Sequence, residues 1–211
     1  MKRYSLICLL AVLLMPLALV SCSEDDNTVE EFPNWMEANT DSISRLYDEA
    51  GQYADGSWKI IRNYSLEGAI ASNYSNSIVV KVLKEGTGSG YPMFTDSVKV
   101  NYRGRLMAST SYPEGYVFDQ SYEGDYNFAT ALPAQLYVGG MIDGVATALM
   151  NMRIGDRWEI YIPYQLGYGA TGSSSIPAYS TLVFDMELVA YYRAGVSPKS
   201  RAAGEGVWIT E

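Results

Sequence analysis

The sequence S-V-K-V-N-Y-R-G-R-L at Ser97–Leu106 has apolar or aromatic residues at every second position from Val98 to Tyr102. A period of two is typical of a β-strand that buries one face. The same alternation recurs at Trp158–Ile162 (W-E-I-Y-I) and at Leu182–Leu188 (L-V-F-D-M-E-L). Because most of the intervening positions are polar, we expect antiparallel strands with one buried and one solvated face.

A single helix is predicted within this strand-rich part of the chain, at Met141–Met152. Its apolar residues Ile142, Val145 and Leu149 fall on one stripe. Upstream, Ser77–Leu83 is rich in β-branched residues and is predicted to form a further strand. Together these patterns predict an α+β domain, in which an antiparallel β-sheet is curved around one short α-helix.

The residues that precede this domain, 34–77, are predicted to form an N-terminal helical arm. Apolar residues recur at spacings of three and four from Asn34 to Ala54, Pro33 suits a helix start, and Gly51 suits a helix end. W-K-I-I-R-N-Y at Trp58–Tyr64 is predicted to be a short strand. Two alternatives remain open for the arm, which either packs on the main domain or acts as a dimerisation element.

Residues 1–21 have the pattern of a secretory leader, with Lys2 and Arg3 ahead of the apolar run Leu6–Val20. The run is too short for a comfortable membrane span. It ends in L-V-S-C, which resembles the bacterial lipobox, whose cysteine becomes the lipidated N-terminus. This resemblance implies an envelope lipoprotein, anchored through Cys22 on the periplasmic or the surface-exposed face of the outer membrane. The alternative is a plain signal peptide with an incidental cysteine.

Residues 22–33 are predicted to be an acidic tether. The chain carries a net charge of −9, and ten of its 24 acidic residues lie between Cys22 and Asp55, against one basic residue, Arg45. A run of like charges repels itself and stays extended. A second interpretation is an address, since the acidic run resembles the surface-export signals of some lipoproteins. No basic patch suggests a nucleic-acid partner.

The residue types of this 211-residue chain exclude several kinds of chemistry. Histidine is absent, which excludes Ser-His-Asp and Cys-His catalysis and most zinc sites. The only cysteines are Cys8 and Cys22, and Cys8 leaves with the leader, so the mature chain is expected to have no disulfide. We therefore expect no metal and no cofactor.

Six motifs follow one another in the central part of the chain. They are V-N-Y-R-G-R-L, V-F-D-Q-S, M-I-D-G-V-A-T-A-L, M-R-I-G-D-R-W-E-I-Y-I-P, L-G-Y-G-A-T-G and I-P-A-Y-S-T-L-V-F-D-M-E-L. In order and spacing they resemble the FK506-binding-protein (FKBP) family of peptidyl-prolyl cis-trans isomerases. The resemblance assigns residues 78–192 to an FKBP-type isomerase domain and leaves residues 193–211 as a C-terminal tail.

The family resemblance implies an activity and its partners. It implies an enzyme that catalyses rotation about Xaa-Pro bonds in extracytoplasmic proteins and so assists their folding. Proline-containing polypeptides are then the substrates, FK506-type macrolides are expected ligands, and no cofactor is needed.

The resemblance also implies a pocket. Tyr102 corresponds to a wall tyrosine whose hydroxyl meets the carboxylate of Asp119, and Tyr168 corresponds to a tyrosine that binds a substrate carbonyl. Phe118 completes the catalytic set. The substrate-binding positions are apolar: Met141, Ile142, Val145, Ile176 and Phe184.

Each of these residues also has a simpler interpretation. Phe118, Ile142 and Phe184 are of a type that usually packs in a core, and Asp119 is of a type that caps turns. A carboxylate next to Phe118 in an apolar setting needs partners, however, and this favours the pocket.

The sequence departs from the family pattern at two kinds of position. Val145 stands where the family usually has a tryptophan, and Ala134 stands where many members have another aromatic residue, so a wider pocket is predicted. Trp158 does not obviously replace the missing tryptophan. Two segments, 107–116 and 121–132, are longer than usual and are expected to re-line the pocket rim or to bind a partner. They carry five aromatic residues: Tyr112, Tyr116, Tyr122, Tyr126 and Phe128.

These departures support a rival function on the same fold. In that interpretation the protein is a non-catalytic module that binds peptides or a partner protein, or acts as a chaperone. Such a module could also be one subunit of a surface lipoprotein complex. The C-terminal tail carries no functional motif. Its last residues, V-W-I-T-E, are expected to dock on the domain as a strand.

Overall fold

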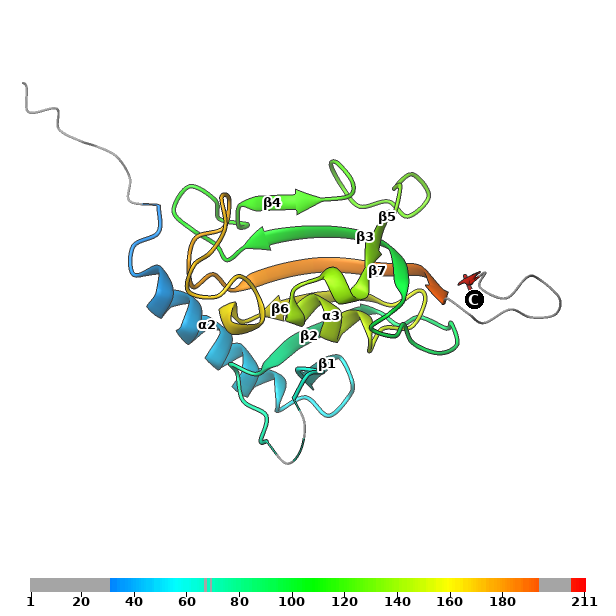
Figure 1. Ribbon diagram of the computed structural model, residues 1–211. Helices are drawn as coiled ribbons and strands as arrows, with labels where there is room; N and C mark the ends of the chain where they lie inside the picture. The colour runs from blue at the N-terminus through cyan, green and yellow to red at the C-terminus, as the bar shows by residue number, and fades with distance from the viewer. Residues whose placement is uncertain (1–30, 67, 69, 194–205) are drawn as a thin grey trace, which may run out of the picture. The chain divides into compact units, whose positions relative to one another are not determined.

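The protein is built on an antiparallel β-sheet. The computed structural model describes residues 31–66, 68, 70–193 and 206–211. Residues Glu31–Glu211 form one unit. In the described residues the sheet has eight strands in the order β1-β2-β6-β7-β3-β4, with β5 also on β3 and β8 on β7 (Figure 1). The strands are β1 Trp58–Arg62, β2 Ser77–Lys84, β3 Ser97–Leu106, β4 Val117–Gln120, β5 Ala134–Tyr137, β6 Arg157–Ile162, β7 Leu182–Arg193 and β8 Val207–Ile209. The helices are α2 Trp35–Ala50 and α3 Asp143–Leu149, with single turns η1 Val138–Gly140 and η2 Tyr164–Leu166.

The alternation seen in the sequence divides the sheet into two faces. Phe184 on β7 pairs with Ile160 on β6, and Met186 pairs with Tyr102 on β3, so these side chains share one face. Helix α3 crosses this inner face (Figure 1), and its buried residues join those of the strands in the main hydrophobic core. The predicted α+β fold is confirmed.

Helix α3 is shorter than its apolar stripe predicted. It begins at Asp143 rather than Met141, because Met141 and Ile142 have extended backbones with ψ angles of 159° and 150°. It ends at Leu149, before Met152. Met141 and Ile142 therefore lie just before the helix and not within it. Both line the candidate site described below.

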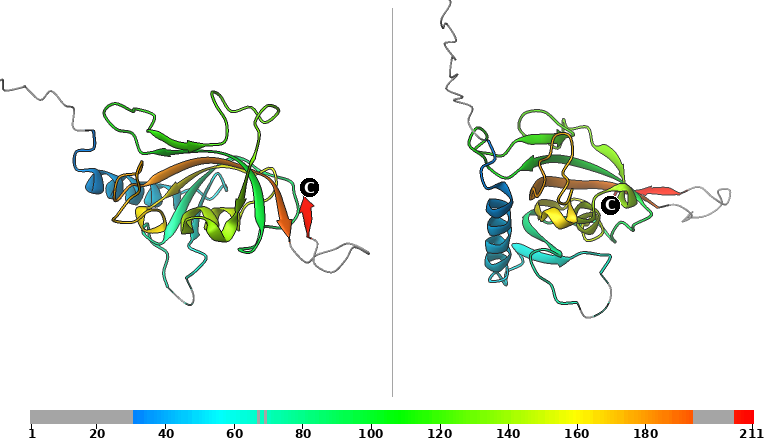
Figure 2. Two further views of the ribbon diagram at one scale, coloured as in Figure 1. Left: turned by 45° about the horizontal axis from the view of Figure 1, so that its top comes forward. Right: turned by 60° about the vertical axis from the view of Figure 1, so that its left-hand side comes forward.

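The outer face, predicted to be solvated, is partly covered. Helix α2 packs there through Ile43 against Val79 of β2, together with Tyr161 of β6. Figure 2 shows this helix as a blue rod along the side of the sheet. Val183 and Glu187 of β7 also point outward and are nonetheless buried. The face predicted to be solvated is therefore solvated only in part, because a helix and a long loop pack on it.

The N-terminal arm packs on the domain, which was the first of its two predicted alternatives. The indole nitrogen Nε1 of Trp35 donates to Ser180 Oγ at 2.8 Å. One turn later Asn39, only 1% exposed, accepts from the backbone N–H of Thr181 at 2.8 Å and donates to the Trp35 carbonyl. Strand β1 follows and pairs with β2, so the arm adds both a strand and a covering helix.

Asn39→Ala is expected to lower the stability of the folded protein by about 1–3 kcal/mol, because it leaves the buried N–H of Thr181 without an acceptor. For a chain of this size the loss corresponds to a fall of roughly 2–10 °C in Tm, measured by thermal unfolding. The matched control is Asp41→Ala on the exposed side of the same helix, which is expected to leave Tm within about 2 °C. Equal Tm values for both variants would contradict the role of Asn39.

The last strand comes from the C-terminal tail. Val207–Ile209 pairs antiparallel with β7, with Trp208 opposite Tyr192. The expectation of a docking strand at the end of the chain is confirmed. The sheet therefore extends beyond residues 78–192 at both ends, through β1 and β8. In the part of the chain that the structure describes, no helix has the length and apolar character needed to cross a membrane.

The I-G-D motif at Ile154–Asp156 has a structural role, because its aspartate binds backbone N–H groups of two segments. The Asp156 carboxylate, 5% exposed, accepts from the backbone N–H of Gly86 at 2.7 Å and from that of Arg153 at 2.6 Å. Gly155 has φ +89°, a conformation that favours glycine. Asp156 thus joins the turn before β6 to the segment that follows β2.

Candidate active site

A pocket of about 460 Å³ opens between the inner face of the sheet and the segment around α3. The nine pocket residues predicted from the sequence all line it, so the structure brings them together. They are Tyr102, Phe118, Asp119, Met141, Ile142, Val145, Tyr168, Ile176 and Phe184.

Three aromatic rings form one wall of this pocket. Phe118 on β4 meets Phe184 on β7 edge to face, with ring centroids 5.6 Å apart, and Tyr102 on β3 lies 6.3 Å from Phe184. Between them β3 carries Gly104, where a Cβ atom would come within 2.7 Å of both phenylalanine rings. The glycine therefore lets the two rings meet over the strand.

One hydrogen bond organises the polar edge of the pocket. The Tyr102 hydroxyl donates to Asp119 Oδ2 at 2.7 Å. Burial of the phenol, and next the bond to the carboxylate, raise the pKa of Tyr102 above its usual value. The phenol therefore stays protonated at neutral pH and remains a donor.

Asp119 does not sit in the apolar setting that the sequence suggested. Its side chain is exposed at the mouth of the pocket, while Phe118 beside it is half-buried. Because β4 is an edge strand, one side of the carboxylate faces solvent. An exposed carboxylate can be hydrated, so Asp119 does not need the Tyr102 hydroxyl to offset a cost of burial.

Tyr168 and Ile176 stand on the connection between β6 and β7. Tyr168 is 40% exposed at the pocket mouth, whereas Ile176 is buried. Within the described residues the Tyr168 hydroxyl makes no hydrogen bond. It is therefore free to donate to a carbonyl of a bound chain, as its role in the prediction requires.

Five further residues line the pocket that were not predicted. Met186 could have been found, because it lies two positions after Phe184 on the same face of β7. Leu136 on β5 follows from the same rule, once β5 is placed against β3. The others lie in loops or turns, where no periodic signal marks them: Gly140, Ser173 and Ser175.

The two departures from the family pattern fall at different places. Val145, on the first turn of α3, lines the pocket as predicted, whereas Ala134 does not. Trp158 is fully buried in the core and does not line the pocket, so it does not substitute for an aromatic residue at Val145. The predicted widening of the pocket stays a prediction.

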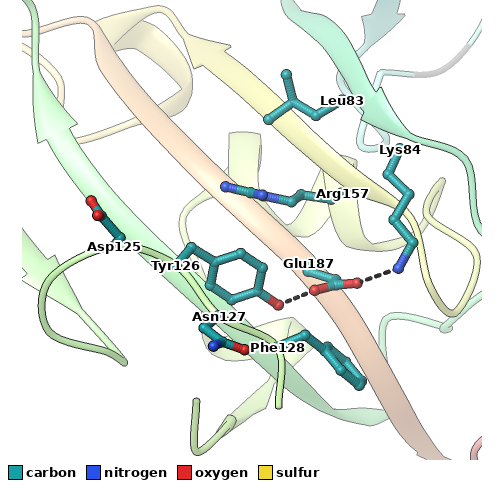
Figure 3. Close-up of a pocket in the computed structure, with 8 residues that line it drawn as sticks. All are labelled: Leu83, Lys84, Asp125, Tyr126, Asn127, Phe128, Arg157 and Glu187. Atoms are coloured by element: carbon teal, nitrogen blue, oxygen red, sulfur yellow. Dashed lines mark hydrogen bonds and ion pairs between the residues drawn. The ribbon is translucent and has the colours of Figure 1, made fainter. Parts of the chain in front are cut away.

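The longer segment 121–132 does not re-line the rim of this pocket. It lies instead over the outer face of the sheet, where Tyr126 and Phe128 line a separate pocket of about 770 Å³ (Figure 3). The Tyr126 hydroxyl donates to the buried carboxylate of Glu187, and Lys84 Nζ binds the same carboxylate at 2.9 Å. The guanidinium of Arg157 lies over the Tyr126 ring at 4.3 Å.

This outer pocket is balanced in charge. Lys84 is paired with Glu187, and Arg157 makes two bonds with Asp185, at 2.8 and 2.5 Å. The two ion pairs join strands of the sheet to one another, and Tyr126 fastens the long segment to the sheet through Glu187, which indicates a structural role for the segment. Among the described residues no group of three His, Cys, Asp or Glu side chains is arranged to hold a metal ion.

Comparisons with known proteins agree with this geometry. Residues 88–189 match the family described as FKBP-type peptidyl-prolyl cis-trans isomerase. The chain is 36% identical over 137 residues to the FKBP-type 22 kDa peptidyl-prolyl cis-trans isomerase of Escherichia coli, covering 64% of this chain and 59% of that protein. It is 37% identical over 131 residues to the macrophage infectivity potentiator of Trypanosoma cruzi, covering 62% and 59%.

A solved structure is also similar. The crystal structure of a peptidyl-prolyl cis-trans isomerase from Pseudomonas syringae aligns with a TM-score of 0.51 and 29% identity, covering 74% of this chain and 95% of that one. The chain spans 59% of the length of the two curated relatives. Residues 88–189, the segment that matches the FKBP-type peptidyl-prolyl cis-trans isomerase family, contain all nine predicted pocket residues.

Proposed function

We propose that the protein is a peptidyl-prolyl cis-trans isomerase that rotates Xaa-Pro bonds in extracytoplasmic polypeptides and assists their folding. One observation carries the proposal. A pocket with an apolar wall has a polar edge made by the Tyr102–Asp119 hydrogen bond of 2.7 Å, and the hydroxyl of Tyr168, which makes no hydrogen bond to any described residue, lies at its mouth. Such a site binds an apolar ring and orients the peptide groups on either side of it.

The chemistry follows from the barrier that has to be lowered. Resonance opposes rotation of a peptide bond by about 18–20 kcal/mol, and no covalent bond needs to break. A twisted amide is less polar than a planar one, so a water-poor wall of Phe118, Ile142 and Phe184 favours it over the ground state. In the proposed mechanism, Tyr168 holds a flanking carbonyl while the proline ring stays in the pocket.

The deciding experiment measures isomerisation of several Xaa-Pro peptides by the full chain, with and without an FK506-type inhibitor. Rates above background that the inhibitor suppresses are expected. A rival candidate, a binding module without catalysis, is favoured by Val145 at a position where the family usually has a tryptophan. Peptide binding without any acceleration would support that rival and reject the enzyme.

We further propose that the protein is a lipoprotein of the cell envelope, anchored in a membrane through Cys22. The support is the sequence alone, the leader that ends in L-V-S-C and the acidic run after it, since residues 1–30 lie outside the described residues. Its partners in this proposal are proline-containing envelope proteins, reached from the periplasmic or the surface-exposed face. The interpretation of residues 22–33 as a tether or as an export address belongs to the same proposal.

Cys22→Ser is expected to release the protein from membranes or to block its processing, because each buried acyl CH₂ contributes about 0.8 kcal/mol to membrane binding. The measurement is the share of protein in the membrane fraction, together with the mass of its N-terminal peptide. Ser21→Ala is a suitable control, since it leaves the thiol in place. A correctly cleaved Cys22→Ser protein that stays on membranes would contradict the anchor.

A further inference from the structure

A second hollow, of about 450 Å³, adjoins the candidate active site. The two share the wall made by Ser173, Ser175 and Ile176, on the connection between β6 and β7. A polypeptide with its proline ring beside Ile176 therefore has a continuous surface along which to extend. Besides Leu106 at the end of β3, the remaining walls of the hollow come from two segments that do not line the first pocket.

The first of these segments is the long connection between β3 and β4. It presents Tyr112 and Tyr116, whose rings meet edge to face with centroids 5.1 Å apart. The segment is closed on itself, because the backbone N–H of Gly115 donates to the Tyr112 carbonyl at 2.9 Å and that of Leu106 to the Tyr116 carbonyl at 2.9 Å. The aromatic pair is therefore held in place before any ligand arrives.

The second segment is the short stretch that leads into α2. Phe32 lines the hollow and stacks edge to face on Trp35 at 4.7 Å, and Trp35 is itself bonded to Ser180. Next to it the carboxylate of Glu31 accepts from the hydroxyl of Ser109 and from the N–H of Ser111. The two segments are thus bonded to each other across the hollow.

The surface of the hollow is aromatic, and its rings are open to solvent. Tyr112 is 43% and Tyr116 36% exposed, and no other described residue covers them. Among the described residues that line the hollow, the one charged group is the Glu31 carboxylate. Large exposed aromatic side chains in a preformed hollow favour an apolar or aromatic guest, and the carboxylate disfavours an acidic one.

We propose that this hollow is a second subsite of the same enzyme, which binds a large apolar or aromatic side chain that lies two or three residues away from the proline of the substrate. The proposal rests on the proposed isomerase function and adds a substrate preference to it. The occupant follows from continuity with the candidate active site, since one extended chain reaches both hollows across the shared wall. Phe32, Tyr112 and Tyr116 are the residues assigned to this specificity.

The test uses alanine-based peptides with one proline, in which phenylalanine replaces alanine at one position at a time, either two or three residues before the proline or two or three residues after it. At one of these positions or more, phenylalanine is expected to raise kcat/KM of the full chain about ten-fold over alanine, the usual scale for filling an apolar subsite. Aspartate at the same position is expected to give no gain.

The ratio of the phenylalanine to the alanine peptide is then measured in Tyr112→Ala, in the double variant with Tyr116→Ala, and separately in Phe32→Ala. We expect the ratio to fall to about two or less in the double variant. Each ratio compares two peptides on one preparation, so it does not depend on the amount of folded protein. The matched control is Phe128→Ala, an exposed aromatic residue of the outer pocket, which is expected to keep the full ratio.

The outcomes separate the two proposals. Turnover of the alanine peptide without any gain from phenylalanine, or a gain that the double variant and Phe32→Ala both retain, overturns the subsite but leaves the isomerase standing. A larger gain from arginine than from phenylalanine also overturns it, since a cation is then the preferred guest. If the unchanged chain turns over no peptide, the isomerase function fails and the subsite fails with it.

Discussion

Asp119→Leu is expected to lower kcat/KM for Xaa-Pro peptides on the order of ten- to a hundred-fold while the fold survives. The carboxylate accepts a hydrogen bond from the Tyr102 hydroxyl at 2.7 Å, and among the described residues that line the pocket it supplies the only charge. A hydrogen bond to a charged group is worth about 1.5–3 kcal/mol, which sets that range when the bond acts in the transition state. Because Asp119 is exposed, its loss removes little packing.

Two companion variants define how the carboxylate acts. Tyr102→Phe removes the same hydrogen bond from the other side, so the double variant with Asp119→Leu should cost little more than the worse single variant. Tyr168→Phe removes the separate hydroxyl at the mouth and should add its own loss. Circular dichroism checks the fold of each variant.

The matched control is Asp125→Leu, an exposed carboxylate in the loop over the outer face. It should leave kcat/KM within about two-fold, because it touches no residue of the candidate site. An unchanged rate in Asp119→Leu would reject the catalytic assignment, and the rival binding module would then be the better interpretation.

Asp156→Ala should cause the largest loss of stability, about 3–5 kcal/mol. Its two carboxylate oxygens hold the backbone N–H groups of Gly86 and Arg153 at 2.7 and 2.6 Å, and both bonds lie where water is scarce. The two backbone segments are closely packed at this point, since a Cβ at Gly86 would lie 2.3 Å from the carbonyl oxygen of Ile154. The expected fall in Tm is roughly 6–20 °C.

Asp156→Asn provides the graded comparison. Its amide keeps one acceptor oxygen and places a donor against the second N–H, so its Tm should lie between those of Asp156→Ala and the unchanged protein. Chemical denaturation with an unchanged m-value would confirm that stability changed and not the mode of unfolding. A Tm for Asp156→Ala within 2 °C of the unchanged protein would show that the I-G-D turn is not held by this carboxylate.

The strands and most of the pocket could be predicted because both depend on local patterns. Alternation assigned Tyr102 and Phe184 to one face, and strands that share a face bring such residues together whatever the connecting loops do. The order of the motifs then added Tyr168 and Ile176, which lie on a connection with no period of its own. Sequence patterns are strongest where the backbone itself is periodic.

The positions of the long segments could not be predicted in the same way. Tyr112 and Tyr126 stand in similar insertions, yet one lies beside the candidate site and the other over the opposite face. The choice depends on partners far away in the chain, such as Glu187 for Tyr126 and Glu31 for Ser109. The exposure of Asp119 was missed for a related reason, since nothing local shows that its strand lies at an edge.

If the proposed lipid anchor and isomerase function hold, the bonds between Glu31 and the segment 107–116 limit how far from the membrane the protein can act. Nine residue steps separate Cys22 from Glu31, and a fully extended chain of that length spans at most ~30 Å. With Cys22 held in lipid, as proposed, Glu31 stays within that distance of the bilayer surface, and the segment bonded to Glu31 stays near it. The clients within reach are then chains that are close to the membrane as they fold. Inserting residues into the 22–30 segment would widen the zone in which a client is caught.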